Sequence, residues 1–200
     1  MDGTLVLVRH GESEWNAKNV WTGLTDIGLT QKGRDEAAKA ADAVKDISFD
    51  AAFTSPLSRA KETLKIMRNN VPVHESAALN ERDYGIYTGK NKLEIKKELG
   101  DENFLKLRRG WDYPIPQGES LKQVYARVIP YYEKEILPLL IMGKKVLVVA
   151  HGNSLRALIK YLDTVSDEDI SKVELATGEI VMYTIDPSGA VNSRDKRTVD

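Results

Sequence analysis

Two short, continuously apolar runs stand out in a chain whose other hydrophobic positions mostly follow helical spacing. Residues 5–8 read Leu-Val-Leu-Val, and residues 146–150 read Val-Leu-Val-Val-Ala. Such runs are typical of strands buried on both faces of a parallel sheet. Each run is followed by a His-Gly pair: His10 comes one residue after the first run, and His151 comes directly after the second. The pattern therefore predicts two buried strands with a polar turn at each carboxyl end.

The segments between these strands alternate between expected helices and strands. Residues 30–45 form an expected helix, whose spacing predicts a buried face made of Ala37, Ala38, Ala41 and Val44. Residues 49–54 read as a further strand, and Ser58 is expected to cap a helix that continues to about residue 67. Residues 71–74 are a short expected strand.

The second half continues the alternation. Gly100 is expected to split residues 92–109 into two short helices, and Pro130 to kink a long helix that begins at Ser120. A last strand is expected over residues 180–185, and the polar tail from about residue 186 is expected to be flexible. Together these elements predict a single α/β domain over residues 1–200, with a mostly parallel sheet flanked by helices on both faces.

Composition narrows the functional classes. The formal net charge of −1 argues against a nucleic-acid partner, which usually meets a strongly basic protein. The absence of cysteine excludes disulfides, thiolate metal sites and thiol nucleophiles. The apolar stretch over residues 136–142 is too short to span a bilayer, which needs about 20 residues. With no signal segment ahead of the first strand, we expect a cytoplasmic enzyme without a membrane partner.

The two His-Gly turns are the main candidates for chemistry. Carboxyl ends of parallel strands meet at one edge of a sheet, where α/β proteins bind ligands. A lone histidine is more often structural, but two in matching positions favour a shared function for His10 and His151. The third histidine, His74, has no such setting and is expected to lie on the surface.

The neighbours of these histidines point to phosphate. Arg9 precedes His10, and Arg59 begins the helix after the second strand; arginine binds phosphate through two parallel hydrogen bonds. Helix N-termini after both histidines are expected to add backbone donors. Neutral imidazole is a competent nucleophile, so the residues predict phosphoryl transfer through a phosphohistidine. Glu12 or Glu14 beside His10 could suggest metal ligands, but no metal motif is present and none is expected.

Several stretches carry a family resemblance. Residues 7–16 read Leu-Val-Arg-His-Gly-Glu-Ser-Glu-Trp-Asn, which resembles the histidine phosphatase superfamily. Six stretches together are similar to the cofactor-dependent phosphoglycerate mutases, and they occur in the same order as in that family. They are residues 7–16, 22–23, 54–60, 79–85, 108–110 and 151–156. The resemblance implies a three-layer α/β/α fold, a small phosphorylated three-carbon acid as substrate, and 2,3-bisphosphoglycerate as the priming phosphoryl donor without a metal.

The resemblance also implies roles for individual residues. His10 would be the phosphorylated nucleophile, and Glu81 the general acid and base for the substrate hydroxyls. The groups that would hold the transferred phosphoryl are Arg9, Arg59 and His151, with further donors from Asn16, Thr22, Gly23 and Asn153. The far end of the substrate would be bound by Tyr84, Lys92, Arg108 and Arg109. The implied substrate-binding set also includes Gly11, Ser13, Arg82 and Gly152.

Other interpretations of these residues remain open at the level of sequence. Glu81-Arg82 could be a surface ion pair and Arg108-Arg109 a solvated helix end, although a ligand with three or more negative charges needs such cations. The tryptophans could line the site or pack in the core: Trp15, Trp21 and Trp111. An inert phosphate-binding module is a third possibility, which the full His10, Glu81 and His151 set disfavours.

The chain departs from longer members of the family between residues 110 and 118, where they carry an insertion, and in its short tail. It therefore resembles the short form of the mutases. The oligomeric state stays open. How well the site excludes water also stays open. Water attacking the same phosphohistidine would make the enzyme a phosphatase, so a phosphatase acting on a small phosphate ester is the alternative function.

Overall fold

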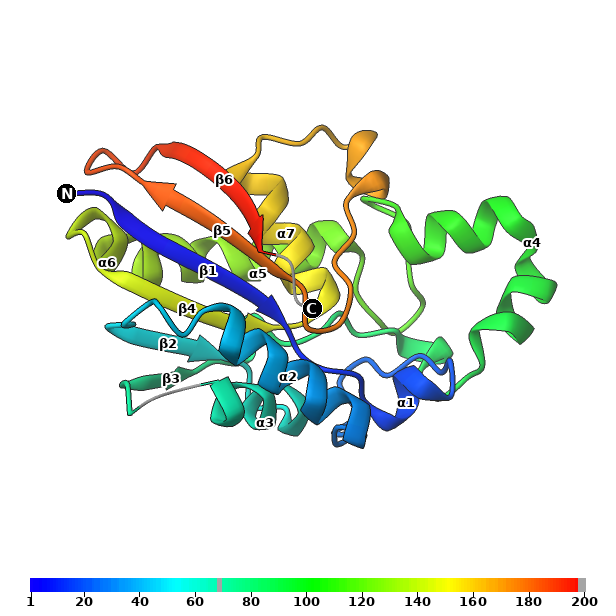
Figure 1. The fold of residues 1–200 in the computed structure, drawn as a ribbon. Helices are drawn as coiled ribbons and strands as arrows, with labels where there is room; N and C mark the ends of the chain where they lie inside the picture. Colours follow the sequence, from blue (N-terminus) through cyan, green and yellow to red (C-terminus); the bar gives the residue numbers. More distant parts are fainter. Residues whose placement is uncertain (68–69, 198–200) are drawn as a thin grey trace.

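The sheet brings distant parts of the chain to one edge. A computed structural model describes residues 1–67 and 70–197, and within them a six-stranded sheet runs in the order β3-β2-β4-β1-β5-β6 (Figure 1). The strands are β1 (Gly3–Arg9), β2 (Ala51–Thr54), β3 (Val73–Glu75), β4 (Lys145–Ala150), β5 (Ile180–Ile185) and β6 (Val191–Arg197). The pairings among β3, β2, β4 and β1 are parallel, and β5 and β6 are added antiparallel.

Helices connect the strands. The α-helices are α1 (Glu14–Ala17), α2 (Gln31–Ala43), α3 (Ser58–Met67), α4 (Lys92–Arg109), α5 (Leu121–Tyr131), α6 (Leu137–Ile141) and α7 (Gly152–Leu162). Shorter turns are the 3-10 segments η1 (Ala77–Leu79), η2 (Gly85–Tyr87) and η4 (Asp169–Lys172), and the π-helical η3 (Tyr132–Ile136). Among the described residues, no helix is long and apolar enough to cross a membrane.

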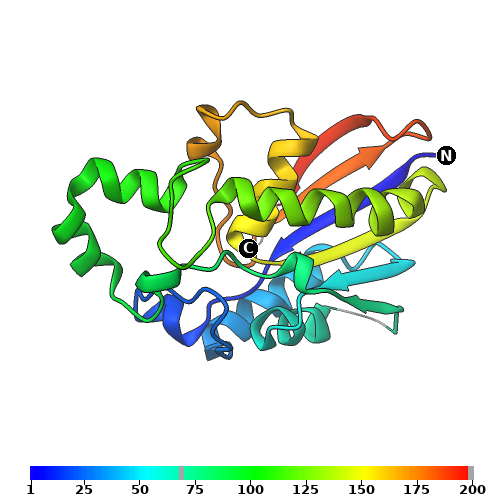
Figure 2. The same ribbon diagram turned by 180° about the vertical axis from the view of Figure 1, so that it is seen from behind.

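Alternate residues of the central strands face opposite layers, as strand geometry requires. Leu5 and Leu7 of β1 pack with α5 and α7 on one face, whereas Val6 and Val8 pack with α2 and α3 on the other. Figures 1 and 2 show the helices on the two sides of the sheet. The predicted α/β architecture with helices on both faces is confirmed.

The register of β1 and β4 positions the two histidines. Arg9 pairs with Ala150, so the next residue of each strand, His10 and His151, leaves the sheet at the same level. The His10 amide donates to the Ala150 carbonyl at 3.0 Å. Helix α4 lies beyond these carboxyl ends (Figure 1) and packs through a separate apolar cluster that includes Trp21.

Most expected elements are present, with shifts in detail. Ala37 of α2 and its C-cap Val44 are buried as expected, and Ala41 is half-buried against the same core. Ala38 is exposed, and Ala40 is buried instead. Ser58 is the first residue of α3 rather than its cap, and its hydroxyl donates to Asp26 at 2.7 Å.

Breaks within helices fall close to the expected positions. Gly100 interrupts α4 with φ 74° and ψ 165°, so the two-helix prediction is confirmed. Pro130 lies inside α5, and the helix continues into the π-helical turn η3.

The tail differs from its expectation. Instead of fraying from residue 186, the chain forms β6, which pairs antiparallel with β5. Its side chains are almost all exposed, so its sequence lacks the apolar alternation that identifies a strand.

Candidate active site

The two histidines form the centre of the site. Both are buried, and their ring centroids lie 5.0 Å apart in an edge-to-face arrangement. The Nδ1 of His10 donates to the Gly11 carbonyl at 2.7 Å. A carbonyl can only accept, so this bond places the proton on Nδ1 and leaves the lone pair on Nε2. His10 therefore presents a nucleophilic nitrogen.

A serine orients the second histidine. The Nε2 of His151 and the hydroxyl of Ser55 lie 2.6 Å apart, and Ser55 also accepts from the Leu57 amide at 3.3 Å. Ser55 follows β2, the strand next to β4. Its bond fixes the His151 ring and leaves Nδ1 as the nitrogen available to a ligand.

Burial and nearby arginines keep both rings uncharged. Desolvation lowers the pKa of His10 well below its ordinary value, and Arg59 and Arg9 lower it further. Desolvation likewise lowers the pKa of His151, with Arg59 and His10 adding to the effect. Neutral imidazole is the form that attacks phosphorus, so the environment favours the reactive state of His10.

Two arginines beside the histidines are arranged to receive an anion. Arg59 is almost fully buried and donates to the carbonyls of Thr25 and Gly23 at 2.9 and 2.8 Å, which holds its guanidinium in place. Arg9 donates to the Leu175 carbonyl at 2.6 Å. The Nε of Arg9 and the hydroxyl of Thr22 are buried and have no hydrogen-bond partner within residues 1–67 and 70–197. Buried donors without partners are costly, so these groups favour a bound anion.

Glu81 lies between this end and α7. One oxygen, Oε1, accepts three hydrogen bonds: from the Arg82 amide at 2.7 Å, the Asn153 amide at 3.1 Å and the Asn153 side chain at 3.0 Å. The other oxygen, Oε2, has no partner in the described part of the chain and faces Gly152. This arrangement holds the carboxyl in position and leaves one oxygen available for proton transfer.

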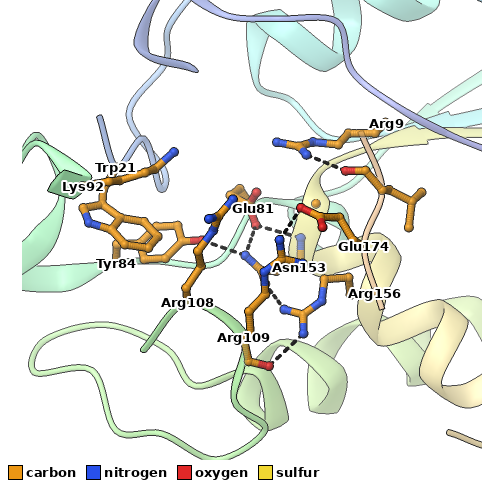
Figure 3. A pocket seen from close by; sticks show the side chains of 12 residues that line it. Arg9, Trp21, Glu81, Tyr84, Lys92, Arg108, Arg109, Asn153, Arg156 and Glu174 are labelled. Atoms are coloured by element: carbon orange, nitrogen blue, oxygen red, sulfur yellow. Dashed lines mark hydrogen bonds and ion pairs between the residues drawn. The ribbon is translucent and has the colours of Figure 1, made fainter. Parts of the chain in front are cut away.

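Helix α4 supplies a second group of cations. Lys92, Arg108 and Arg109 line the same cavity as Glu81, and Figure 3 shows them around Tyr84 and Asn153. Burial, with added repulsion from Arg108 and Arg9, lowers the pKa of Lys92 to about 8. These cations repel one another when no ligand is present, which favours a ligand that carries negative charge at this end.

The histidine end and the outer end are two pockets that share part of their lining. The residues that line both are Arg9, Trp21, Glu81, Tyr84 and Lys92. Only the histidine end adds His10, Asn16, Thr22, Gly23 and Arg59, and only the outer end adds Arg108, Arg109, Gly152, Asn153, Arg156, Glu174 and Leu175. A ligand with two anionic groups can therefore contact cations at both ends.

Four implied site residues do not line either pocket: His151, which is fully buried behind His10, and three implied binding residues. Gly11 packs against Gly33 of α2, where a Cβ would lie 2.0 Å from a carbonyl oxygen. Ser13 caps α1. Arg82 is fully buried and donates to the carbonyls of Leu107 and Arg108, so it supports the α4 end rather than a ligand.

Other expectations are corrected as well. Glu81-Arg82 is not a surface ion pair, because Arg82 bonds to backbone carbonyls elsewhere. No helix begins directly after His10; the next one, α1, has four residues and is capped by Ser13. Of the tryptophans, Trp21 lines the cavity, whereas Trp111 packs against Tyr125. In the part of the chain that the structure describes, no three His, Asp or Glu side chains gather as a metal site would require.

Three lining residues carry no expected role in the sequence analysis: Arg156, Glu174 and Leu175. Arg156 lies three residues after Asn153, one helical turn, and its Nη1 donates to the Asn153 side chain at 2.9 Å. That spacing could have indicated it. Glu174 and Leu175 lie on an irregular loop after η4, where no local pattern signals a site.

The comparisons with known proteins agree with this geometry. The family model of the histidine phosphatase superfamily (branch 1) matches residues 5–195, and the chain belongs to that family. A relative from Parvibaculum lavamentivorans, named 2,3-bisphosphoglycerate-dependent phosphoglycerate mutase, is 48% identical over 198 residues, covering 96% of this chain and 94% of the relative. The resemblance found in the sequence is thereby confirmed.

Two solved structures share the fold. Bacillus stearothermophilus YhfR matches with a TM-score of 0.85 and 26% identity, covering 95% of this chain and 94% of that one. Phosphoserine phosphatase from Entamoeba histolytica, solved with 3-phosphoglyceric acid, matches with a TM-score of 0.79 and 27% identity, covering 98% of this chain and 97% of that one.

Proposed function

We propose that the chain interconverts 3-phosphoglycerate and 2-phosphoglycerate through a phosphoryl group carried on His10. The observation that carries the proposal is the pair of pockets that share Lys92, with His10 and Arg59 in one and Arg108 and Arg109 in the other. Phosphoglycerate has one phosphate and one carboxylate, so it offers one anion to each end. The mutase name of the Parvibaculum lavamentivorans relative supports the same reaction.

The priming step follows from the positions of His10 and Glu81. With 2,3-bisphosphoglycerate bound, the Nε2 of His10 would attack one phosphorus, and the N–P bond would form as the P–O bond to the glycerate oxygen breaks. Glu81 gives a proton to the leaving oxygen through Oε2. Arg9 and Arg59, which line the histidine end, would stabilise the negative charge spread over the phosphoryl oxygens, together with His151, whose ring centroid lies 5.0 Å from that of His10.

The productive step runs in the opposite sense. Glu81 removes the proton of the free hydroxyl of a bound monophosphate, and that oxygen takes the phosphoryl from His10. The resulting bisphosphate reorients, and its other phosphoryl is returned to His10. Because both orientations place an anion at each end, the same distal cations serve both, as the mutase reaction requires.

A phosphatase acting on a small phosphate ester is the second candidate. The specific observation that favours it is the Entamoeba histolytica structure, a phosphatase that shares the fold. Water attacking phosphorylated His10 would release phosphate. A phosphatase of small esters has less use for three distal cations, so we place it second.

An activity assay separates the two. We expect 3-phosphoglycerate with catalytic 2,3-bisphosphoglycerate to give rapid 2-phosphoglycerate, followed by coupling to enolase. Parallel measurement of free phosphate reports hydrolysis. Phosphate release without 2-phosphoglycerate would contradict the mutase function and leave the phosphatase.

The nucleophile can be tested directly. Incubation with 2,3-bisphosphoglycerate should give an acid-labile, base-stable phosphoenzyme, and His10→Ala should abolish it. His74→Ala is the matched control, because His74 is exposed and lies outside the cavity. Persistence of the phosphoenzyme in His10→Ala would assign the phosphoryl group to another residue.

The proposal also covers the setting of the enzyme. A phosphoglycerate mutase acts on a glycolytic metabolite, so we place the chain in the cytoplasm with a small phosphorylated three-carbon acid as its partner. The cofactor is 2,3-bisphosphoglycerate, and His10, Arg9 and Arg59 are the residues that would receive its phosphate.

A further inference from the structure

A carboxylate lies among the cations of the outer cavity. Five cationic side chains line that end, namely Arg9, Lys92, Arg108, Arg109 and Arg156. The two anionic residues lining it in the described chain are Glu81 and Glu174. Glu81 is held by Asn153 and Arg82, as described above, so Glu174 is the anion that directly faces the distal cations.

Glu174 engages the cation that a ligand would use. Its carboxylate accepts a hydrogen bond from Nη2 of Arg109, and Figure 3 shows the side chain directed toward Arg109. The Nη1 of Arg109 donates to the Val173 carbonyl at 3.4 Å. The Arg109 side chain is 13% exposed, whereas that of Glu174 is 62% exposed. Arg109 is therefore fixed in the cavity wall, and Glu174 reaches it from the solvent side.

The backbone around Glu174 is anchored on both sides. Arg156 donates to the carbonyls of Ile170 at 2.7 Å and Val173 at 3.0 Å, and Arg9 donates to that of Leu175 at 2.6 Å. The Glu174 side chain can therefore turn away from Arg109 without displacing the loop. Because the Glu174 carboxylate is largely exposed, water screens the pair, and an incoming anion can replace it at low cost.

We propose that Glu174 is an internal counter-anion of the distal site: it occupies Arg109 in the empty cavity, gives way to the distal anionic group of the ligand, and so sets the affinity for that group. The identity of the ligand rests on the proposed function. This makes Glu174 a specificity-determining residue rather than a catalytic one.

Competition between Glu174 and the ligand for Arg109 would help turnover of the mutase reaction. A bisphosphate that reorients between two phosphoryl transfers must be held by both ends but must also release them. A carboxylate that competes for Arg109 weakens the ground-state hold on the intermediate, and equal binding of all bound states would not help turnover. The Arg109 guanidinium holds the pKa of Glu174 below its usual range, with Arg108 and Arg9 adding to the effect, so the competing charge is present at neutral pH.

Binding of a matched pair of ligands tests the proposal. Isothermal titration calorimetry is run with 3-phosphoglycerate, which has a carboxylate at its far end, and with glycerol 3-phosphate, which lacks it. We expect Glu174→Gln to tighten 3-phosphoglycerate by about 3- to 10-fold, the scale of one unit charge removed near an anion in a solvent-screened site. Glycerol 3-phosphate should change by less than about 2-fold.

Two further variants separate the effect of the Glu174–Arg109 contact from the effect of removing one negative charge anywhere on the protein. Glu168→Gln removes the same charge from an exposed residue outside the cavity and should leave both affinities unchanged. In an Arg109→Gln background, Glu174→Gln should lose its effect, because the cation for which it competes is gone. An equal gain for both ligands, the same gain in Glu168→Gln, or weaker binding of 3-phosphoglycerate in Glu174→Gln would overturn the proposal.

Failure here is distinct from failure of the proposed function. Affinity changes as expected in a chain without mutase turnover would keep the role of Glu174 and remove the mutase. Mutase turnover with unchanged affinities would keep the mutase function and remove the role of Glu174.

Discussion

At the residue scale, the site separates groups that react from groups that hold them. His10 keeps Nε2 free because Nδ1 is bonded to Gly11, and Glu81 keeps Oε2 free because Oε1 accepts three bonds. In both cases one atom of the side chain is used for positioning and the other is left for chemistry. Such fixed orientation is what makes a nucleophile or a general base effective.

Glu81→Gln tests this division. Glutamine keeps the size of the side chain and can still accept at one oxygen, but it cannot exchange a proton. We expect mutase turnover to fall by about 10²- to 10⁴-fold, the usual contribution of general acid–base catalysis. The phosphoenzyme should still be detectable after incubation with bisphosphoglycerate. Glu98→Gln, at an exposed position on α4, is the control, and near-normal turnover in Glu81→Gln would remove this residue from its role.

The sequence predicted the reacting side chains better than the residues that hold them in position. His10 and His151 were visible because each follows an apolar strand, and the register of β1 with β4 brings them together as expected. Supporting contacts depend on where loops return, which local patterns do not encode. Arg82 was therefore expected to bind substrate but is buried against backbone carbonyls, and Glu174 was not expected at all.

At the element scale, buried strands and capped helices were predictable, and surface elements were not. The strand β4 is apolar throughout because both faces are covered, whereas β6 is a polar edge strand whose pairing depends on β5. On α2 the prediction is wrong for Ala38 and misses Ala40, because a helix rich in alanine offers no large side chain to mark its buried stripe. Breaks were easier to identify, since glycine and proline act locally.

Gly100 breaks α4 in a backbone conformation that disfavours other residues. Its φ of 74° and ψ of 165° lie in a region that essentially only glycine adopts, although a Cβ would meet no atom within 4 Å. Backbone strain alone should therefore make Gly100→Ala less stable by about 1–3 kcal/mol. Urea denaturation followed by circular dichroism measures the change. Gly28→Ala is the matched control, because it also has open space but no positive φ; equal stability of both variants would show that α4 straightens without strain.

At the scale of the whole molecule, a nearly neutral chain concentrates positive charge in one cavity. The formal net charge is −1, yet the outer cavity alone is lined by five cations and two carboxylates. The two buried histidines add no positive charge to this region, because desolvation and the arginines lower the pKa of both rings and keep them neutral. Function and pH stability are therefore linked through the same two rings.

This linkage has a definite sign. The pKa of each ring is lower in the folded protein than in the unfolded chain, so below about pH 6.5 the unfolded state takes up protons that the folded state does not. Stability must then fall as the pH falls. From pH 7.5 to pH 5.5 each histidine should contribute a loss of roughly 1 kcal/mol in the free energy of unfolding.

Comparison with one variant isolates the effect from all other titrating groups. Urea denaturation of the wild type and of His10→Gln at pH 7.5 and pH 5.5 gives two pH-dependent losses, and the wild type should lose roughly 1 kcal/mol more than the variant. Only this difference matters, because the substitution changes absolute stability as well. Equal losses would mean that His10 is protonated as readily in the folded site as in the unfolded chain. The arginine-flanked cavity would then not hold the nucleophile neutral, and the reactive lone pair on Nε2 would need another explanation.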